Sequence, residues 1–174
     1  MKLCIDPGHG MANRSPGVYD SGCVGNGLEE ADVVLVWGEE LRRSVEARGI
    51  QTFMTRRDKV TPVSVGARVQ LARDAGCTHF LSLHVNDAEN PEAHGIETLY
   101  NGDNDFALEV QAAAIACLGL RDRGVKFRND LAVLKFPGTR ALLELGFIKS
   151  DRDVKAFTNN ALMLHTCRML AQIF

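Results

Sequence analysis

The chain has 174 residues, 45% of them hydrophobic, which is the size and composition of one soluble domain with a substantial core. It has no apolar run of about eighteen residues, the length of a transmembrane helix, so we expect no membrane insertion. The net charge of -2 is scattered without a basic block, which argues against nucleic acid as a partner.

The first half of the chain alternates between apolar strands and amphipathic helices. We predict strands over residues 2–5, 50–54 and 79–84, and helices over 29–48 and 63–75. A loop rich in Gly, Ser and Asn fills residues 7–27, between the first strand and the first helix. Apolar residues recur every three or four positions in that helix, and Trp37 belongs to this apolar stripe, so we assign it to the core.

The second half continues the alternation. We predict strands over residues 95–100, 131–135 and 141–148, and helices over 106–117 and 151–173, the last capped by Ser150. The whole pattern predicts an α/β fold: a single domain over residues 1–174, with a mostly parallel six-stranded twisted sheet and helices on both faces. In such sheets ligands bind beyond the carboxyl ends of the strands.

Chemically active side chains follow or end several of these strands. His9 stands between two glycines after the first strand, in "LCIDPGHG", and His84 ends the third, in "LSLHVN". Glu144 lies inside the apolar run "ALLELGF", where an unpaired carboxylate is costly to bury. Glu29 and Glu30 open the first helix; Asn26 and Glu29 have capping-box spacing, which assigns Glu29 to the helix terminus and leaves Glu30 as the candidate ligand.

Two imidazoles and a carboxylate, with a fourth position for water and a further carboxylate as general base, form a known catalytic zinc arrangement. Taken singly, His9 and His84 are better explained as hydrogen-bonded histidines than as ligands, and Glu144 is equally well explained as an edge-strand residue that faces water. Only their combination points to a metal site. Asp6 either accepts hydrogen bonds from its loop or orients a histidine ring. The remaining histidines are assigned structural roles: His79, His94 and His165. For His94, a position in a substrate groove is the alternative.

Five segments then resemble one family, in its order and spacing: "IDPGHG", "GLEEADVVL", "LSLHVN", "HGIETLY" and "LLELGFIKSDRD". The chain resembles the zinc-dependent N-acetylmuramoyl-L-alanine amidases of the amidase-3 type, which cleave bacterial peptidoglycan between the muramoyl lactyl group and L-alanine. The resemblance implies that His9, Glu30 and His84 bind Zn²⁺, that Glu144 is catalytic and that peptidoglycan is the partner. Asp87, and Thr139 and Arg140 in "FPGTRALLE", depart from the family pattern without touching the ligands.

Two other functions remain open from the sequence. A zinc peptidase or deacetylase would use the same chemistry on another amide, and a non-catalytic wall-binding module would need none of it. The start "MKLCIDPG" has no signal peptide. We therefore expect synthesis in the cytoplasm and release at lysis, as for a phage endolysin, or else the catalytic domain of an exported autolysin. We expect a monomer.

Overall fold

The computed structural model describes residues 1–174 and is built around one six-stranded sheet in the order β6-β1-β7-β10-β8-β9. The strands are β1 (Lys2–Pro7), β6 (Gln51–Met54), β7 (His79–Asn86), β8 (Ile96–Tyr100), β9 (Asp122–Phe127) and β10 (Thr139–Phe147). Four of the five pairings are parallel, and β8 runs antiparallel to β10. The predicted α/β fold with a mostly parallel six-stranded sheet is confirmed.

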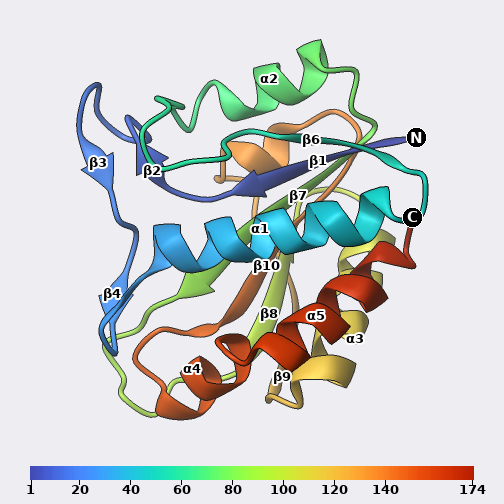
Figure 1. Cartoon of the computed structure of the whole chain (residues 1–174). Coiled ribbons are helices and arrows are strands. Elements are labelled where there is room, and N and C mark those ends of the chain that lie inside the picture. The colour runs from blue at the N-terminus through green and yellow to red at the C-terminus, as the bar shows by residue number, and fades with distance from the viewer.

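Helices cover both faces of the sheet (Figure 1). One face packs against α1 (Glu30–Glu46), α3 (Asp105–Leu118), α4 (Asp151–Phe157) and α5 (Asn160–Ala171), and the other against α2 (Arg68–Asp74) and the 3₁₀ turn η1 (Val133–Lys135). In β7, Leu81 and Leu83 enter the larger core and Phe80 the smaller one. Because side chains alternate along a strand, His84 shares the α2 and η1 side with Phe80.

The loop after β1 lies at the edge of the sheet where β1 and β7 end (Figure 1). It contains four strands of two residues each, β2 (Gly10–Met11), β3 (Tyr19–Asp20), β4 (Val24–Gly25) and β5 (Leu28–Glu29), which pair as two small ribbons. The predicted loop over residues 7–27 is thus an ordered cover. It lies where ligands bind in parallel sheets.

Several predicted elements are wrong in detail. Residues 131–135 contain the turn η1 (Val133–Lys135) and no strand, and the sixth strand of the sheet is β9. The second helix begins at Arg68 instead of at residue 63. The predicted last helix is two helices. The first ends at Phe157, and Asn159 caps the second by accepting hydrogen bonds from Ala161 N and Leu162 N. Ser150 does cap α4, as predicted.

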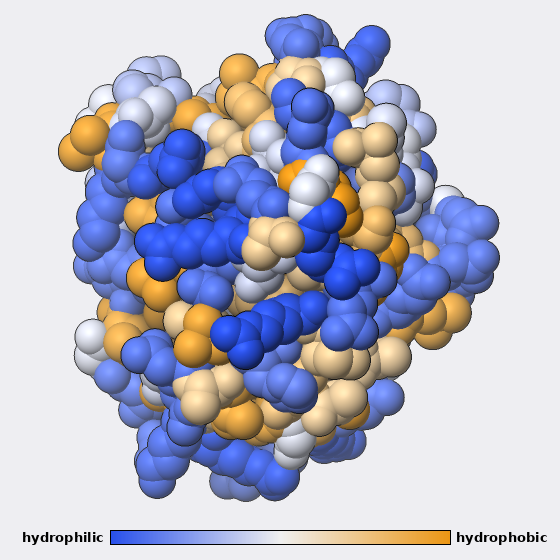
Figure 2. Space-filling view, turned by 45° about the vertical axis from the view of Figure 1, so that its right-hand side comes forward, coloured by the Kyte–Doolittle hydropathy of each residue, from blue (hydrophilic) through white to orange (hydrophobic).

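The core includes Trp37, which is 1% exposed and donates Nε1 to Phe157 O at 3.0 Å, as its position on the apolar stripe predicts. The face in Figure 2 is largely hydrophilic, with hydrophobic residues in small groups. No helix is both long and apolar enough to cross a bilayer. Both chain ends lie on the side away from the β2–β5 cover (Figure 1), and Phe174 packs on His79 at the start of β7.

Candidate metal centre

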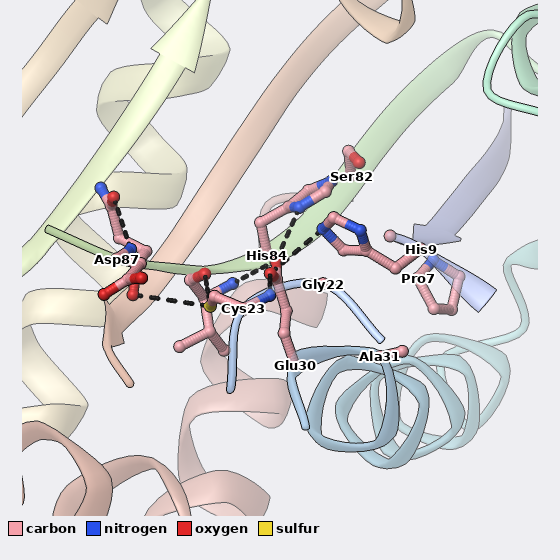
Figure 3. Close-up of polar contacts among 12 residues, drawn as sticks. Pro7, His9, Gly22, Cys23, Glu30, Ala31, Ser82, His84 and Asp87 are labelled. Carbon is pink, nitrogen blue, oxygen red and sulfur yellow. Dashed lines mark hydrogen bonds and ion pairs between the residues drawn. The ribbon is translucent and has the colours of Figure 1, made fainter. Parts of the chain in front are cut away.

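Three predicted side chains from distant parts of the sequence meet at the carboxyl edge of the sheet. His9 follows β1, His84 lies in β7, and Glu30 is the first residue of α1. One ligand atom from each lies within 4.8 Å of the other two. The Glu30 carboxylate lies between the imidazoles, 3.1 Å from His9 Nε2 and 2.8 Å from His84 Nδ1. Figure 3 shows both rings directed at this carboxylate.

Glu30, and not Glu29, faces the histidines, as expected, but the capping argument that selected it is wrong. Asn26 donates its side-chain amide to Ile148 O instead of capping the helix, and Glu29 is exposed at the N-cap position without a capping bond. The first free N–H groups of α1 donate to carbonyl oxygens of the loop. Glu30 N donates to Cys23 O at 3.0 Å, and Ala31 N donates to Ser21 O at 2.9 Å. The cover loop, rather than a side chain, therefore starts this helix.

Backbone donors fix the Glu30 carboxylate. Val85 N donates to Oε1 at 3.0 Å and Cys23 N donates to Oε2 at 2.9 Å. Burial alone would raise the pKa of Glu30, but hydrogen bonds from His84 and His9 and the charges of those rings hold the pKa far below its usual range. The group is therefore an anion, positioned between two imidazole rings.

Asp20 orients His9, a role that the sequence analysis missed. Its Oδ2 lies 3.0 Å from His9 Nδ1 and accepts Asn13 Nδ2 at 2.7 Å, while Gly22 N donates to Oδ1 at 3.0 Å. Burial raises the pKa of Asp20, but these hydrogen bonds outweigh it and bring the pKa to about 2. An aspartate that accepts a hydrogen bond from Nδ1 leaves Nε2 as the ring nitrogen that can bind a metal ion.

Asp6 does not touch a histidine, so the interpretation of Asp6 as a ring-orienting residue is wrong. Its buried carboxylate accepts Arg68 Nη1 at 2.7 Å, Thr55 Oγ1 at 2.6 Å and Ser82 Oγ at 2.7 Å. Burial raises the pKa of Asp6, but the Arg68 guanidinium and the two hydroxyls lower it below its usual value. The pair anchors the end of β1 below the site.

Gly8 is required by the close packing of the two histidine segments. A Cβ atom at this position would lie 2.2 Å from His84 Cε1, so any side chain would displace the ring. The residue before His9 must be a glycine because the backbone passes directly over the His84 ring at this point.

Glu144 lies beside the three residues on the neighbouring strand. It is the register partner of His84 across the β10–β7 pairing and of Glu97 across β10–β8. Its Oε2 is buried without a hydrogen-bond partner. Burial and the charges of Glu30 and Glu97 raise its pKa well above the usual value. A carboxyl group without an internal partner, next to a candidate metal centre, is suited to proton transfer.

All four residues line one cavity of about 460 Å³, which opens between the cover loop and the η1 segment. The three other histidines do not line it. His79 contacts Thr78 Oγ1 at 2.9 Å, and His94 Nδ1 lies 2.8 Å from Glu92 O. These contacts agree with the structural roles assigned to His79 and His94. His94 does not line this cavity, so the alternative of a position in the substrate groove is not supported here.

An α/β sheet that brings two histidines and a glutamate together beside a second, unpartnered glutamate is the arrangement of zinc-dependent hydrolases. The sequence profile of the amidase-3 family, N-acetylmuramoyl-L-alanine amidases, matches residues 3–169. The chain belongs to this family, as its motifs indicate.

Individual relatives agree with the family match. N-acetylmuramoyl-L-alanine amidase LytC of Bacillus subtilis is 32% identical over 157 residues, which cover 87% of this chain and 30% of LytC. The chain thus spans less than a third of that relative. The solved amidase AmiC2 of Nostoc punctiforme superposes with a TM-score of 0.87 at 26% identity, over 99% of this chain and 93% of AmiC2. An amidase from Clostridium difficile 630 gives 0.86 at 25% identity, over 98% and 92%.

Proposed function

We propose that the chain is a peptidoglycan hydrolase that cleaves the amide between the N-acetylmuramoyl lactyl group and L-alanine, with Zn²⁺ held by His9, Glu30 and His84. The single observation that supports it most strongly is the convergence of these three donors next to the unpartnered Glu144, in a member of the amidase-3 family. Two imidazole nitrogens and one carboxylate are ligands that zinc accepts while keeping an open position. The donor set therefore fits the ion.

The chemistry divides between the ion and the chain. When bound, Zn²⁺ supplies a Lewis acid for the amide carbonyl and lowers the pKa of water to about 7. Glu144 takes a proton from the attacking water and passes it to the alanine nitrogen, because an amide expels an amine only after that nitrogen is protonated. Asp20 holds His9 in the tautomer and orientation that ligation requires.

The amidase proposal is tested on purified sacculi by the bond that is cut. We expect released stem peptides with an alanine amino terminus and intact glycan strands. A zinc peptidase would expose other amino termini, and a deacetylase would release acetate instead. Either product pattern would contradict the proposed bond. A non-catalytic wall-binding module would bind sacculi and release nothing.

Variants at the centre separate metal binding from catalysis. We expect Glu144→Gln to keep one zinc per chain but to lose cell-wall hydrolysis by at least about a hundredfold, the usual loss for a general base. His84→Ala should lose both metal and activity, since it removes one of three donors. Metal content and dye release from labelled sacculi report the two properties. A Glu144→Gln variant with near wild-type activity would contradict the assignment of Glu144 as the general base.

The place of action follows from the substrate: we propose the bacterial cell wall. The relatives include wall amidases such as LytH of Staphylococcus aureus, described as a probable cell wall amidase. The endolysin origin and the monomeric state stay predictions.

A further inference from the structure

The cavity continues beyond Glu144, away from the metal centre, over β8 and the segment that leads into η1. Leu142 and Leu99 are register partners on β10 and β8, and both line the cavity together with Leu131 and Val133. This part of the wall is apolar. It adjoins Glu144, the group placed to protonate the leaving nitrogen.

The direction of the substrate follows from that role. The amide carbonyl must face the metal donors, and Glu144 must reach the nitrogen on its leaving side. The peptide attached to this nitrogen therefore extends past Glu144, toward β8 and β9. The apolar wall is then in position to contact the alanine methyl group.

Three cations lie on β9 or directly after it, on the side of the sheet toward which the peptide would extend. Arg123 Nε donates to Glu97 Oε2 at 2.6 Å, and Lys126 also binds that oxygen, so two cations share one carboxylate. Arg128 follows β9 and lines the cavity. Its partner is Asp130, reached by Nε and Nη2 at 2.8 Å each. Of these three cations only Arg128 lines the cavity, and its carboxylate partner, Asp130, is exposed.

Arg128 is held at the backbone but free to exchange its side-chain partner. Its N–H donates to Tyr100 O at 2.8 Å, which fixes the residue to the end of β8. The side chain of Arg128 is 44% exposed and that of Asp130 is 59% exposed. An ion pair this exposed is weak because water screens it. A carboxylate of a ligand could replace Asp130, since guanidinium binds carboxylates through two parallel hydrogen bonds.

We propose that Arg128 binds a carboxylate of the stem peptide on the leaving side of the scissile amide, in exchange for Asp130. The inference rests on the proposed amidase function and adds a specificity determinant to it. Peptides with a free carboxyl group on the residue after alanine are then preferred over peptides in which that group is amidated.

The test compares two soluble muramoyl peptides that differ only in this group, free or amidated, by kcat/KM of the zinc-loaded protein. We expect the wild type to prefer the free acid by about tenfold, the usual worth of a partly exposed charged hydrogen bond. Arg128→Gln should abolish the preference, and Arg128→Lys should keep part of it. Asp130→Asn should raise kcat/KM for the free acid, because it removes the competing carboxylate.

Lys149→Gln is the matched control. Lys149 is 53% exposed and pairs with Asp87, which lines the same cavity, at 3.0 Å. This variant should leave the preference unchanged. If the wild type shows no preference, or if Arg128→Gln retains it, the inference is wrong although the amidase activity stands. If the wild type cuts neither peptide at the amide, the proposed function itself fails.

Discussion

His9 has a backbone conformation that histidine seldom adopts, with φ of 61°. A left-handed residue other than glycine costs about 1 kcal/mol. Two buried guanidinium groups offset this cost: Arg68 Nη2 donates to His9 O at 2.6 Å, and Arg56 Nη2 donates to Gly8 O at 2.7 Å. Arg56 also reaches Ala31 O at 2.6 Å, next to Glu30. The two segments that carry the candidate ligands His9 and Glu30 are thus held together by the protein alone.

Asp20 offers a test of this ordering at a residue that does not itself bind the metal. We expect Asp20→Ala to weaken zinc binding by about 10-fold to 100-fold, the usual loss when the residue that orients a histidine ligand is removed. Zinc titration of the metal-free protein with a competing chelator measures the change. The exposed Asp151, in the first turn of α4, provides the control variant Asp151→Ala, which should bind zinc as the wild type does. Equal zinc affinity of both variants would rule out an orienting role for Asp20.

The sequence reveals three of the four central residues for a physical reason. His9, His84 and Glu144 follow, end or interrupt apolar segments, and the topology brings such positions to one edge. Glu30 is selected over Glu29 by a capping argument that the structure contradicts, so the sequence identifies Glu30 only through the family resemblance. Asp20 gives no comparable signal, because it is one polar residue among many in a glycine-rich loop. Its contact with His9 depends on how that loop folds back. This path is set by the local pairing of the cover strands and by backbone bonds to distant segments, such as Val65 N to Asn13 O at 2.9 Å.

Among the elements, β10 is the one whose shape matters most for Glu144. Its register with β7 shifts between Glu144 and Phe147. Phe147 N and Gly95 N both donate to Asp153 Oδ2, at 2.9 Å and 2.7 Å. This buried carboxylate thus joins the end of β10 to the segment before β8. The bulge bends β10 directly after the catalytic candidate.

Gly146 makes the bulge possible, and its replacement should show this. Its φ is 150°, and an added Cβ would lie 2.9 Å from Asp153 Cβ. We expect Gly146→Ala to lower the free energy of unfolding by about 2 kcal/mol through strain and overpacking. Urea denaturation checks the change. Gly66→Ala is the control, because nothing lies within 4 Å of a Cβ built there, so it should be neutral or slightly stabilising. Similar stability of the two variants would contradict the strained bulge.

The strands buried on both faces were predictable because their apolar runs are continuous, as in β1, β7 and β10. The edge strand β9 was not, since "DRGVKF" is half polar and contains a glycine. The segment "LAVLK" has a strand-like composition but covers the sheet as the turn η1, so its buried residues Val133 and Leu134 serve tertiary packing. Local composition cannot distinguish a buried cover from a buried strand.

At the scale of the whole molecule, the candidate metal centre ties together separate parts of the chain. Glu30 and His84 are 54 residues apart in sequence, and they belong to a helix and to a central strand. An ion bound only by the folded state adds stability that grows with its free concentration. Metal loss should therefore loosen the cover loop and α1 as well as stop catalysis.

Zinc should raise the melting temperature accordingly. At a free concentration about a thousand times the dissociation constant, we expect a gain of about 4 kcal/mol, or on the order of 10 °C for a domain of this size. Calorimetry of the chelated and zinc-loaded protein measures it. His84→Ala should show no such gain, and magnesium should not replace zinc, because Mg²⁺ prefers oxygen ligands. A melting temperature independent of zinc in the wild type would count against the centre.

The position of the two chain ends has a practical consequence. Both lie on the side of the molecule away from the β2–β5 cover, with Phe174 against the start of β7. A module fused at either terminus would lie at the opposite end of the strands from the cavity and leave its mouth clear. Such modules could therefore be exchanged without obstructing access of the proposed substrate.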